Sequence, residues 1–539
     1  MWRLEMSFAW LVALAVLFMA YNIRKSLRHI HMMQQNSYLN SRYFRWFSSR
    51  LKKHGIHALD LREAALSAAV ILIFAGDSLL SFIALAFTAA AYILLTVFYK
   101  KGRAAEKKPL VMTNRAKRLY GVNIFLLLAL AAVIIILKTD LFIAVPIFVA
   151  ATWLSSIFAV AANSLLIPVE RAINKSFMND AAKILSEMPY LTVVGVTGSY
   201  GKTSTKFILG NILNEKYMTL VSPESYNTPM GLTRMVREML KPTHEMMVAE
   251  MGARQKGDIE ELCDLVKPRV GIITAVGEQH LETFKNLETI IKTKFELMTA
   301  LPADGTLVVN ADDKNIQEGL KIAHQCNVLG CSFAGNGDYN ISSVKASSKG
   351  SSFIISAPLG ESLQFSTLLL GRHNIMNITC AVALAHQLGV PFSQAAQAVR
   401  RLQPVPHRLS LITTPQGLNI IDDAFNSNPV GAKYALEVLA SFDSGRRILI
   451  TPGMIELGES QVQFNAQFAL AASQICDYII LVGAAQTKPL ADCLHEAAFP
   501  DENLCVARDL AAAREQMIKW AVPGDTILFE NDLPDAYNE

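Results

Sequence analysis

The sequence predicts an N-terminal helical transmembrane region followed by two α/β domains, namely a P-loop domain with a mostly parallel sheet and a Rossmann-like domain. Apolar residues are concentrated before residue 170, in segments without a polar face. After Leu191, short β-branched runs alternate with helical patterns, which is typical of a parallel sheet. The first such run enters a glycine turn that ends in Gly-Lys-Thr-Ser. The length of 539 residues suits three domains, expected at 1–170, 171–402 and 403–539.

Five apolar segments in the first of these regions are candidate membrane spans. Taken alone, the first segment also fits a signal peptide, and the shorter ones fit buried core helices. Their succession favours lipid, and the short turns between the second and third and between the fourth and fifth fit two hairpins. The segments are 8–20, 59–75, 79–98, 122–137 and 141–167.

Basic residues predict the orientation of these spans. The loops after the first and third spans are rich in Lys and Arg, whereas the hairpin turns are nearly uncharged. The positive-inside rule places both basic loops in the cytoplasm and the N-terminus outside. The α/β half then faces the cytoplasm, on a multi-pass protein of the cytoplasmic membrane. The basic loops serve either as topology signals alone or also as sites for anionic headgroups or a phosphorylated, lipid-linked substrate.

Composition excludes other classes of protein. The net charge of +4 gives no general case for binding nucleic acid. Seven cysteines are scattered without a Cys-x-x-Cys pair, which argues against a zinc ribbon or an iron–sulfur site and fits reduced thiols.

The glycine turn has the residues of a P-loop, Gly198-x-x-Gly201-Lys202-Thr203. Its glycines allow backbone N–H groups to surround phosphate oxygens, and a helix expected over 205–213 points its positive end at the same anion. Lys202 supplies charge for the outer phosphates, and the Thr203 hydroxyl suits Mg²⁺. The alternative is an ordinary tight turn.

Three further residues follow predicted strands or lie on a helix nearby. Glu250 ends the strand 246–250, where a carboxylate is well placed for a metal. His280 lies in the loop after the next strand, and a lone loop histidine is more often solvated or satisfied in a core. By spacing alone, Lys294 is interpreted as a solvated helix lysine.

A series of motifs from about residue 190 onward resembles the Mur ligase family, the ATP-dependent amide-bond ligases of peptidoglycan synthesis. The motifs are 197–204, 225–231, 249–253, 280–282, 371–377, 404–409 and 422–429. Within the family, the pattern is nearest to the ligases that add D-alanyl-D-alanine to a UDP-linked muramyl tripeptide. The resemblance implies that a substrate carboxylate takes the γ-phosphoryl group of ATP to give an acyl phosphate, which an amine then attacks.

The resemblance also implies a role for each site residue, with ATP and Mg²⁺ as cofactors. The nucleotide would be held by the P-loop residues and three later residues, which are Gly198, Ser199, Gly201, Lys202, Thr203, Ser204, Asn374 (adenine), Arg408 (domain junction) and Asp423 (ribose). The metal ligands would be Thr203, Glu250, His280 and a carbamylated Lys294. The catalytic set would be Lys202, His280, Lys294 and Arg408.

Departures from the family pattern leave the substrates open. Membrane spans stand where the family has a UDP-sugar domain, Phe425 replaces an expected tyrosine, and His407 replaces a common glycine. The expected partners are a cell-envelope precursor, lipid- or UDP-linked, and an amino acid or dipeptide amine. The alternatives are a poly-γ-glutamate-type polymerase and a membrane transport ATPase. The second is weakened because the spans lack intramembrane charges beyond Asp77, at a turn.

Overall fold

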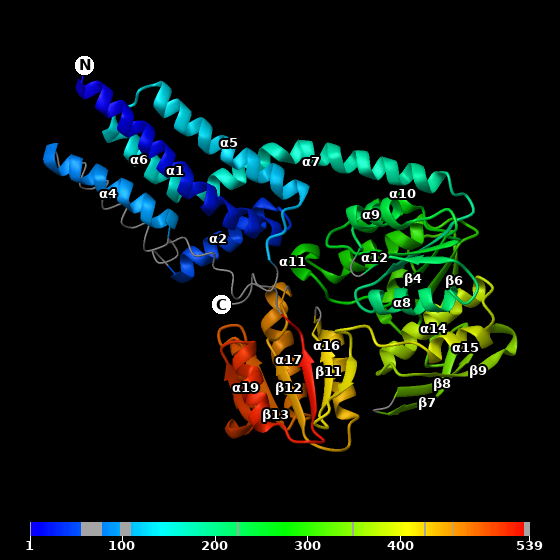
Figure 1. Ribbon diagram of the computed structural model, residues 1–539. Coiled ribbons are helices and arrows are strands. Elements are labelled where there is room, and N and C mark those ends of the chain that lie inside the picture. Colours follow the sequence, from blue (N-terminus) through cyan, green and yellow to red (C-terminus); the bar gives the residue numbers. More distant parts are fainter. Residues whose placement is uncertain are drawn as a thin grey trace. The chain divides into compact units, whose positions relative to one another are not determined.

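The computed structural model describes residues 2–54, 78–97, 109–223, 226–347, 350–424, 427–455 and 457–532. The chain divides into two compact units, one made by the residues up to Lys175 and one that begins at Ser176 (Figure 1).

The first unit is a bundle of helices packed around the first of them, α1. Its described helices are α1 (Trp2–Gln35), α2 (Asn40–His54), α4 (Ser78–Val97), α5 (Asn114–Ile136), α6 (Leu141–Trp153) and the start of α7 (Ser155–Ser186). Helix α1 contacts α4, α5 and α6, and their shared core includes the Phe18 and Phe148 rings, whose centroids lie 4.8 Å apart. Among the residues that the structure describes, three helical stretches are long and apolar enough to cross a membrane: Phe8–Gln35, Asn114–Ile136 and Ser155–Ser186. The expected span 59–75 lies outside the described residues.

The expected fifth span, 141–167, is not a single helix. It divides at Leu154 into α6 and α7, so the prediction of one continuous span is wrong. Polar groups from α1 bind at the division: Lys25 Nζ donates to the Thr152 carbonyl at 2.7 Å, and His29 Nε2 lies 2.9 Å from Ser155 Oγ. The break is stable because these partners satisfy polar groups near a helix end that the apolar core would otherwise leave unpaired.

The second unit begins with a nine-stranded sheet of order β2-β3-β1-β4-β5-β6-β7-β8-β9. Its pairs are parallel from β2 to β7, and β8 and β9 are added antiparallel. The strands are β1 (Thr192–Thr197), β2 (Thr219–Val221), β3 (Met246–Glu250), β4 (Val270–Ile273), β5 (Thr306–Asn310), β6 (Asn327–Ser332), β7 (Tyr339–Ser347), β8 (Gly350–Ser356) and β9 (Ser362–Thr367).

Helices cover both faces of this sheet, since successive residues of β1 enter different cores. Val194 and Val196 pack with α8, α14 and α15, whereas Val193 packs with α9, α10, α12 and α13. The helices are α8 (Lys202–Leu213), α9 (Pro229–Met239), α10 (Asp258–Val266), α11 (Leu281–Phe284), α12 (Leu287–Ala300), α13 (Lys314–Gly319), α14 (Arg372–Gln387) and α15 (Phe392–Arg400). Near-continuous apolar strands such as β3 are expected where a parallel sheet is covered on both faces.

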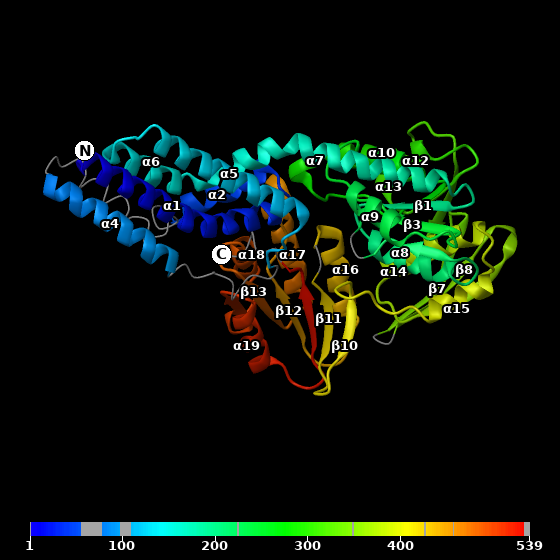
Figure 2. The same cartoon turned by 45° about the horizontal axis from the view of Figure 1, so that its top comes forward.

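A second, six-stranded sheet has the order β10-β11-β15-β12-β13-β14, with only β10 antiparallel to its neighbour (Figure 2). Helices α16, α17 and α18 pack on one face and α19 on the other, which is the expected Rossmann-like arrangement. The elements are β10 (Ser410–Thr413), β11 (Asn419–Asp423), α16 (Pro429–Ala440), β12 (Arg447–Thr451), α17 (Gln461–Ser473), β13 (Tyr478–Val482), α18 (Lys488–Glu496), β14 (Leu504–Ala507), α19 (Leu510–Trp520) and β15 (Thr526–Glu530).

Strand order brings the predicted site residues to one edge of the first sheet. Strand β1 lies between β3 and β4, with Val196 beside Glu250 and Thr197 beside Ile273. The turn after β1 therefore begins next to the Glu250 carboxylate and next to the loop that carries His280. The carboxyl edge of a parallel sheet is where α/β proteins usually bind ligands.

Candidate active site

The turn after β1 adopts a conformation that only glycine fits at two positions. Gly198 and Gly201 have φ values of 147° and 76°. A Cβ at Gly198 would lie 2.2 Å from Thr274 Oγ1, and a Cβ at Gly201 would lie 2.8 Å from Asn377 Oδ1. The two glycines therefore provide both the backbone conformation and the close approach that a phosphate-binding turn needs.

Ser199 connects this turn to the loop after β4. Its hydroxyl donates to the Gly277 carbonyl at 2.9 Å, and the same Ser199 Oγ accepts the Gly277 N–H at 3.1 Å. The Ser199 side chain therefore links the two loops, whereas the resemblance implied that Ser199 holds the nucleotide.

Lys202 is the first residue of α8, so its backbone lies at the positive end of that helix. Its ammonium donates to the carbonyls of Gly198 at 2.7 Å and Ser199 at 3.0 Å. Desolvation lowers the pKa of Lys202 to about 8. The negative charge of Glu250 opposes this shift, and the positive charge of Arg408 adds to it. Phosphate oxygens would provide the anionic partner that this lysine lacks among the loop carbonyls.

Glu250 accepts hydrogen bonds on both carboxylate oxygens and is 1% exposed. Lys206 Nζ lies 2.8 Å and Thr203 Oγ1 3.0 Å from Oε2, while Asn227 Nδ2 donates to Oε1 at 3.0 Å. Burial by itself raises the pKa of Glu250, but Lys206 and Lys202 together hold it below its usual value. The residue is therefore an ionised carboxylate at neutral pH.

The donor set beside the P-loop fits Mg²⁺. A carboxylate accepts about four hydrogen bonds or ligands, so Glu250 keeps capacity beyond its three donors. The Thr203 hydroxyl lies beside it, and Mg²⁺ typically takes one or two carboxylates together with substrate phosphates. Ser204 is partly exposed in the first turn of α8.

His280 is not part of a preformed metal cluster. It is partly exposed, has a left-handed backbone (φ 53°), and is the residue before α11. Among the residues that the structure describes, no group of three or more His, Cys, Asp or Glu side chains is arranged to hold a metal. The metal role expected for His280 stays a prediction.

Lys294 corrects the interpretation drawn from spacing. Its side chain is 2% exposed on α12, so a solvated helix lysine is wrong. Burial and the nearby charge of Lys202 hold its pKa well below the usual value, against weaker effects of Asp258 and Glu296. Its Nζ lies 6.0 Å from the centroid of the Phe284 ring. A buried amine of this kind is available in its neutral form.

The predicted residues of the last domain are brought near the P-loop in part. Burial lowers the pKa of Arg408, and the nearby carboxylates of Asp423 and Glu250 oppose this shift. Asp423 Oδ1 accepts the Leu409 N–H at 3.2 Å, and burial raises the pKa of Asp423 to about 6 although Arg408 opposes the shift. Asp423 thus lies at the end of β11, and the ribose contact expected for it stays a prediction.

Asn374 lies at the start of α14 and is 5% exposed. Its Nδ2 donates to the Leu370 carbonyl at 2.8 Å, so one amide hydrogen is already used within the protein. The neighbouring His373 ring stacks on Tyr434 at 5.0 Å between centroids. Adenine binding by Asn374 stays a prediction.

Three residues of the site were not singled out from the sequence. Lys206 carried a signal, because it follows Lys202 by one helical turn and therefore shares a face of α8. Asn227 and Asn377 lie within quoted motifs, but only the tertiary structure shows that they contact Glu250 and crowd Gly201.

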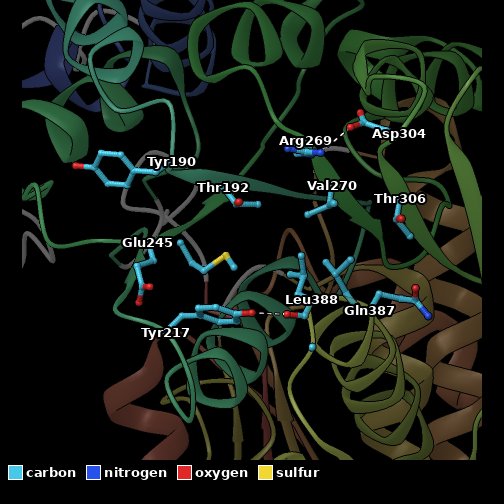
Figure 3. A pocket seen from close by; sticks show the side chains of 13 residues that line it. Tyr190, Thr192, Tyr217, Glu245, Arg269, Val270, Asp304, Thr306, Gln387 and Leu388 are labelled. Atoms are coloured by element: carbon cyan, nitrogen blue, oxygen red, sulfur yellow. Dashed lines mark hydrogen bonds and ion pairs between the residues drawn. The ribbon is translucent and has the colours of Figure 1, made fainter.

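A separate pocket of about 630 Å³ lies at the opposite, amino-terminal edge of the sheet (Figure 3). Its lining includes the first residues of β1, β3, β4 and β5, which are Thr192, Met246, Val270 and Thr306. Arg269 and Asp304 form an ion pair of 2.6 Å there. The pocket is distinct from the P-loop edge and contains none of the predicted site residues.

Comparison with known proteins agrees with this architecture. A model of the Mur ligase middle domain matches residues 196–385, and a model described as "Mur ligase, glutamate ligase domain" matches residues 407–530. The UDP-N-acetylmuramoyl-tripeptide–D-alanyl-D-alanine ligase of Bacillus subtilis is 33% identical over 276 residues, which are 51% of this chain and 59% of that protein. The chain thus matches less than two thirds of this relative's length.

Further relatives cover more of the chain. The Escherichia coli protein of the same name is 29% identical over 362 residues, covering 67% of this chain and 79% of that protein. The crystal structure of MurF from Acinetobacter baumannii has a TM-score of 0.60 and 25% identity, and covers 68% of this chain and 78% of that chain. MurF from Thermotoga maritima in complex with ADP has a TM-score of 0.60 and 24% identity.

The P-loop turn, the buried Glu250 and Lys294, the two sheets and the two matching domain models agree with one another. The chain belongs to the Mur ligase family.

Proposed function

We propose that the chain is a membrane-anchored, ATP-dependent ligase that joins a carboxylate of a cell-envelope precursor to the amine of an amino acid or dipeptide. The observation that carries this proposal is the edge of the first sheet. There a P-loop lysine, an ionised Glu250 and a buried Lys294 lie around one phosphate-binding turn.

The reaction proceeds in two balanced steps. An oxygen of the precursor carboxylate attacks the γ-phosphorus of ATP, which gives an acyl phosphate and ADP. The amine then attacks the acyl carbon, phosphate leaves with the bridging oxygen, and the amine loses a proton. Lys202 stabilises negative charge that develops on the transferred phosphoryl group. Thr203 and Glu250 would hold Mg²⁺, which neutralises phosphate charge when bound.

Lys294 acts in this proposal as a carbamate. Its burial and the neighbouring Lys202 favour the neutral amine, and a neutral amine can add to CO₂ to form a carbamate and release a proton. The product is a carboxylate-like oxygen donor, for which Lys202 is a favourable neighbour.

The names of the relatives suggest the substrates. The Bacillus subtilis and Escherichia coli proteins are named for a UDP-N-acetylmuramoyl tripeptide and D-alanyl-D-alanine. D-alanyl-D-alanine is therefore the first acceptor to test. The donor is a muramyl-type peptide carried by UDP, as in the names of these relatives, or by a lipid. A lipid carrier would suit a chain in which apolar helices precede the domains that match the family.

Membrane anchoring is supported by the three long apolar helical stretches and by the position of basic residues in the first unit. Arg24 donates to the Thr96 carbonyl in the last turn of α4, and Lys25 donates to the Thr152 carbonyl at the end of α6. These cations thus cap helix C-termini at one end of the bundle. The proposed location is the cytoplasmic membrane, with the α/β domains in the cytoplasm.

The test uses the purified full-length chain in detergent with ATP, Mg²⁺ and a panel of UDP- and lipid-linked precursors and amines. We expect a product with the mass of one new amide, and one phosphate per amide. ATP hydrolysis that is independent of the amine would favour a transport ATPase. A ladder of products from one amino acid would favour a polymerase.

A further inference from the structure

The P-loop helix carries a second lysine for which the family resemblance provides no role. Lys206 is fully buried on α8, and its ammonium lies 2.8 Å from Glu250 Oε2. A lysine is rarely buried unless it is paired, because the loss of hydration must be offset by a partner. This pair lies within the proposed metal and phosphate site.

The contacts of Glu250 show what Lys206 does to the carboxylate. Oε2 receives both Lys206 and the Thr203 hydroxyl, and Oε1 receives Asn227. The ammonium therefore balances the carboxylate charge on the side of α8. A further cation that approaches Glu250 meets a carboxylate whose charge is already compensated.

The wider charge distribution acts in the same direction. The positive charge of Lys202 adds to that of Lys206 in stabilising the Glu250 carboxylate, and Arg408 also interacts electrostatically with this carboxylate. Without nucleotide, the surroundings of Glu250 thus favour a polyanion over a free divalent cation. The phosphates of ATP would reverse this balance and would supply oxygen ligands themselves.

We propose that Lys206 is a positioning residue that makes capture of the divalent cation conditional on nucleotide. Its ammonium is the counter-ion of Glu250 in the nucleotide-free state, so the metal enters the site together with the phosphates of ATP. The inference rests on the proposed function only in that the P-loop must bind a nucleotide.

The experiment measures binding of Mn²⁺ to the full-length chain by electron paramagnetic resonance, with and without ADP. For the wild-type chain we expect weak binding of Mn²⁺ alone and binding at least about tenfold tighter with ADP, within the usual range of coupling between sites. Lys206→Gln and Lys206→Met should bind Mn²⁺ alone about tenfold more tightly than wild type, and the effect of ADP should shrink by the same factor.

Two controls separate this role from a general loss of positive charge. Lys321→Met removes an exposed lysine that pairs with Glu318 and should leave Mn²⁺ binding unchanged. Adding Glu250→Gln to Lys206→Gln should abolish the gain in affinity for Mn²⁺ alone, because the carboxylate that Lys206 neutralised is then absent. Lys206→Gln keeps a hydrogen-bond donor beside Glu250, which preserves a folded variant if Lys206→Met unfolds.

Equal affinity for Mn²⁺ without nucleotide in wild type and Lys206→Gln would overturn the inference, as would tight nucleotide-free binding by the wild type. The readout does not depend on amide formation. A chain that shows the expected coupling but makes no amide would contradict the proposed function and leave this inference standing. A chain that binds no ADP would contradict both.

Discussion

At the scale of single residues, the site is governed by lysines in different environments. Lys202 bonds to carbonyls of its own loop, Lys206 pairs with Glu250, and Lys294 is buried on α12. Helical spacing does not distinguish these environments. Helix α12 packs against α10, β1 and β4, and Thr293, Lys294 and Phe295 are all buried in consequence. The motif resemblance suggested a special role for Lys294, whereas the sequence pattern alone suggested solvent.

The role of Lys294 can be tested by chemical rescue. Lys294→Ala should lose most amide formation, because the proposed carbamate is removed, and acetate or formate should restore part of it by supplying a carboxylate to the vacated space. Initial rates are measured with and without each carboxylate. Lys292→Ala, on the exposed side of the same helix, is the matched control. Full activity of Lys294→Arg would rule out the carbamate.

Lys202→Ala should lower turnover by more than about a hundredfold, since it removes the preorganised positive charge that stabilises the transferred phosphoryl group. The rate of amine-dependent phosphate release is measured, and circular dichroism checks that the variant folds. Lys321→Ala removes a comparable but exposed charge and should keep the wild-type rate. Near-normal turnover of Lys202→Ala would remove the P-loop from the mechanism.

At the scale of elements, the turn between β1 and α8 depends on tertiary contacts as well as on its glycines. The sequence predicted the strand, the turn and the helix, and it placed the helix start three residues too late, at 205 instead of Lys202. Local pattern identifies these elements because apolar periodicity and glycine are local signals. It does not reveal Asn377, which approaches Gly201 from α14, far along the chain.

This dependence yields a matched pair of glycine substitutions. Gly201→Ala should weaken ADP binding strongly, because the backbone at this position has a positive φ and the new Cβ would lie 2.8 Å from Asn377 Oδ1. Gly335→Ala also has a positive φ, 83°, but no atom lies within 4 Å of its Cβ. It should cost about 1–2 kcal/mol of stability from backbone strain and leave ADP affinity unchanged.

Isothermal titration with ADP and thermal unfolding of both glycine variants separate the two effects. Equal ADP affinity in Gly201→Ala and wild type would show that the close approach of Asn377 does not matter for the nucleotide.

At the scale of the whole molecule, the sequence predicted the fold class of the α/β part, with its mostly parallel sheets, more completely than the helical unit. Alternating strands and helices identify a parallel sheet, since each strand must be covered on both faces. In the helical unit, the apolar run 141–167 gave no sign of the break at Leu154. The groups that satisfy polar atoms at the break, Lys25 and His29, belong to α1 and are distant in sequence.

The expected topology is tested by labelling single cysteines with a membrane-impermeant maleimide in intact cells. Thr139→Cys, in the turn between α5 and α6, should react from outside. Leu110→Cys, in the segment before α5, should react only after the membrane is permeabilised, because the basic residues around it favour the cytoplasm. Labelling of Leu110→Cys in intact cells would reverse the orientation.

The proposed reaction depends on activation of a carboxylate as an acyl phosphate. The most direct measurement follows oxygen from a precursor whose reacting carboxylate is labelled with ¹⁸O, in the presence of ATP, Mg²⁺ and D-alanyl-D-alanine. The mechanism predicts that each phosphate released with an amide carries one ¹⁸O from the carboxylate. Phosphate that instead takes its new oxygen from water would show hydrolysis without carboxylate activation and would contradict the acyl-phosphate mechanism.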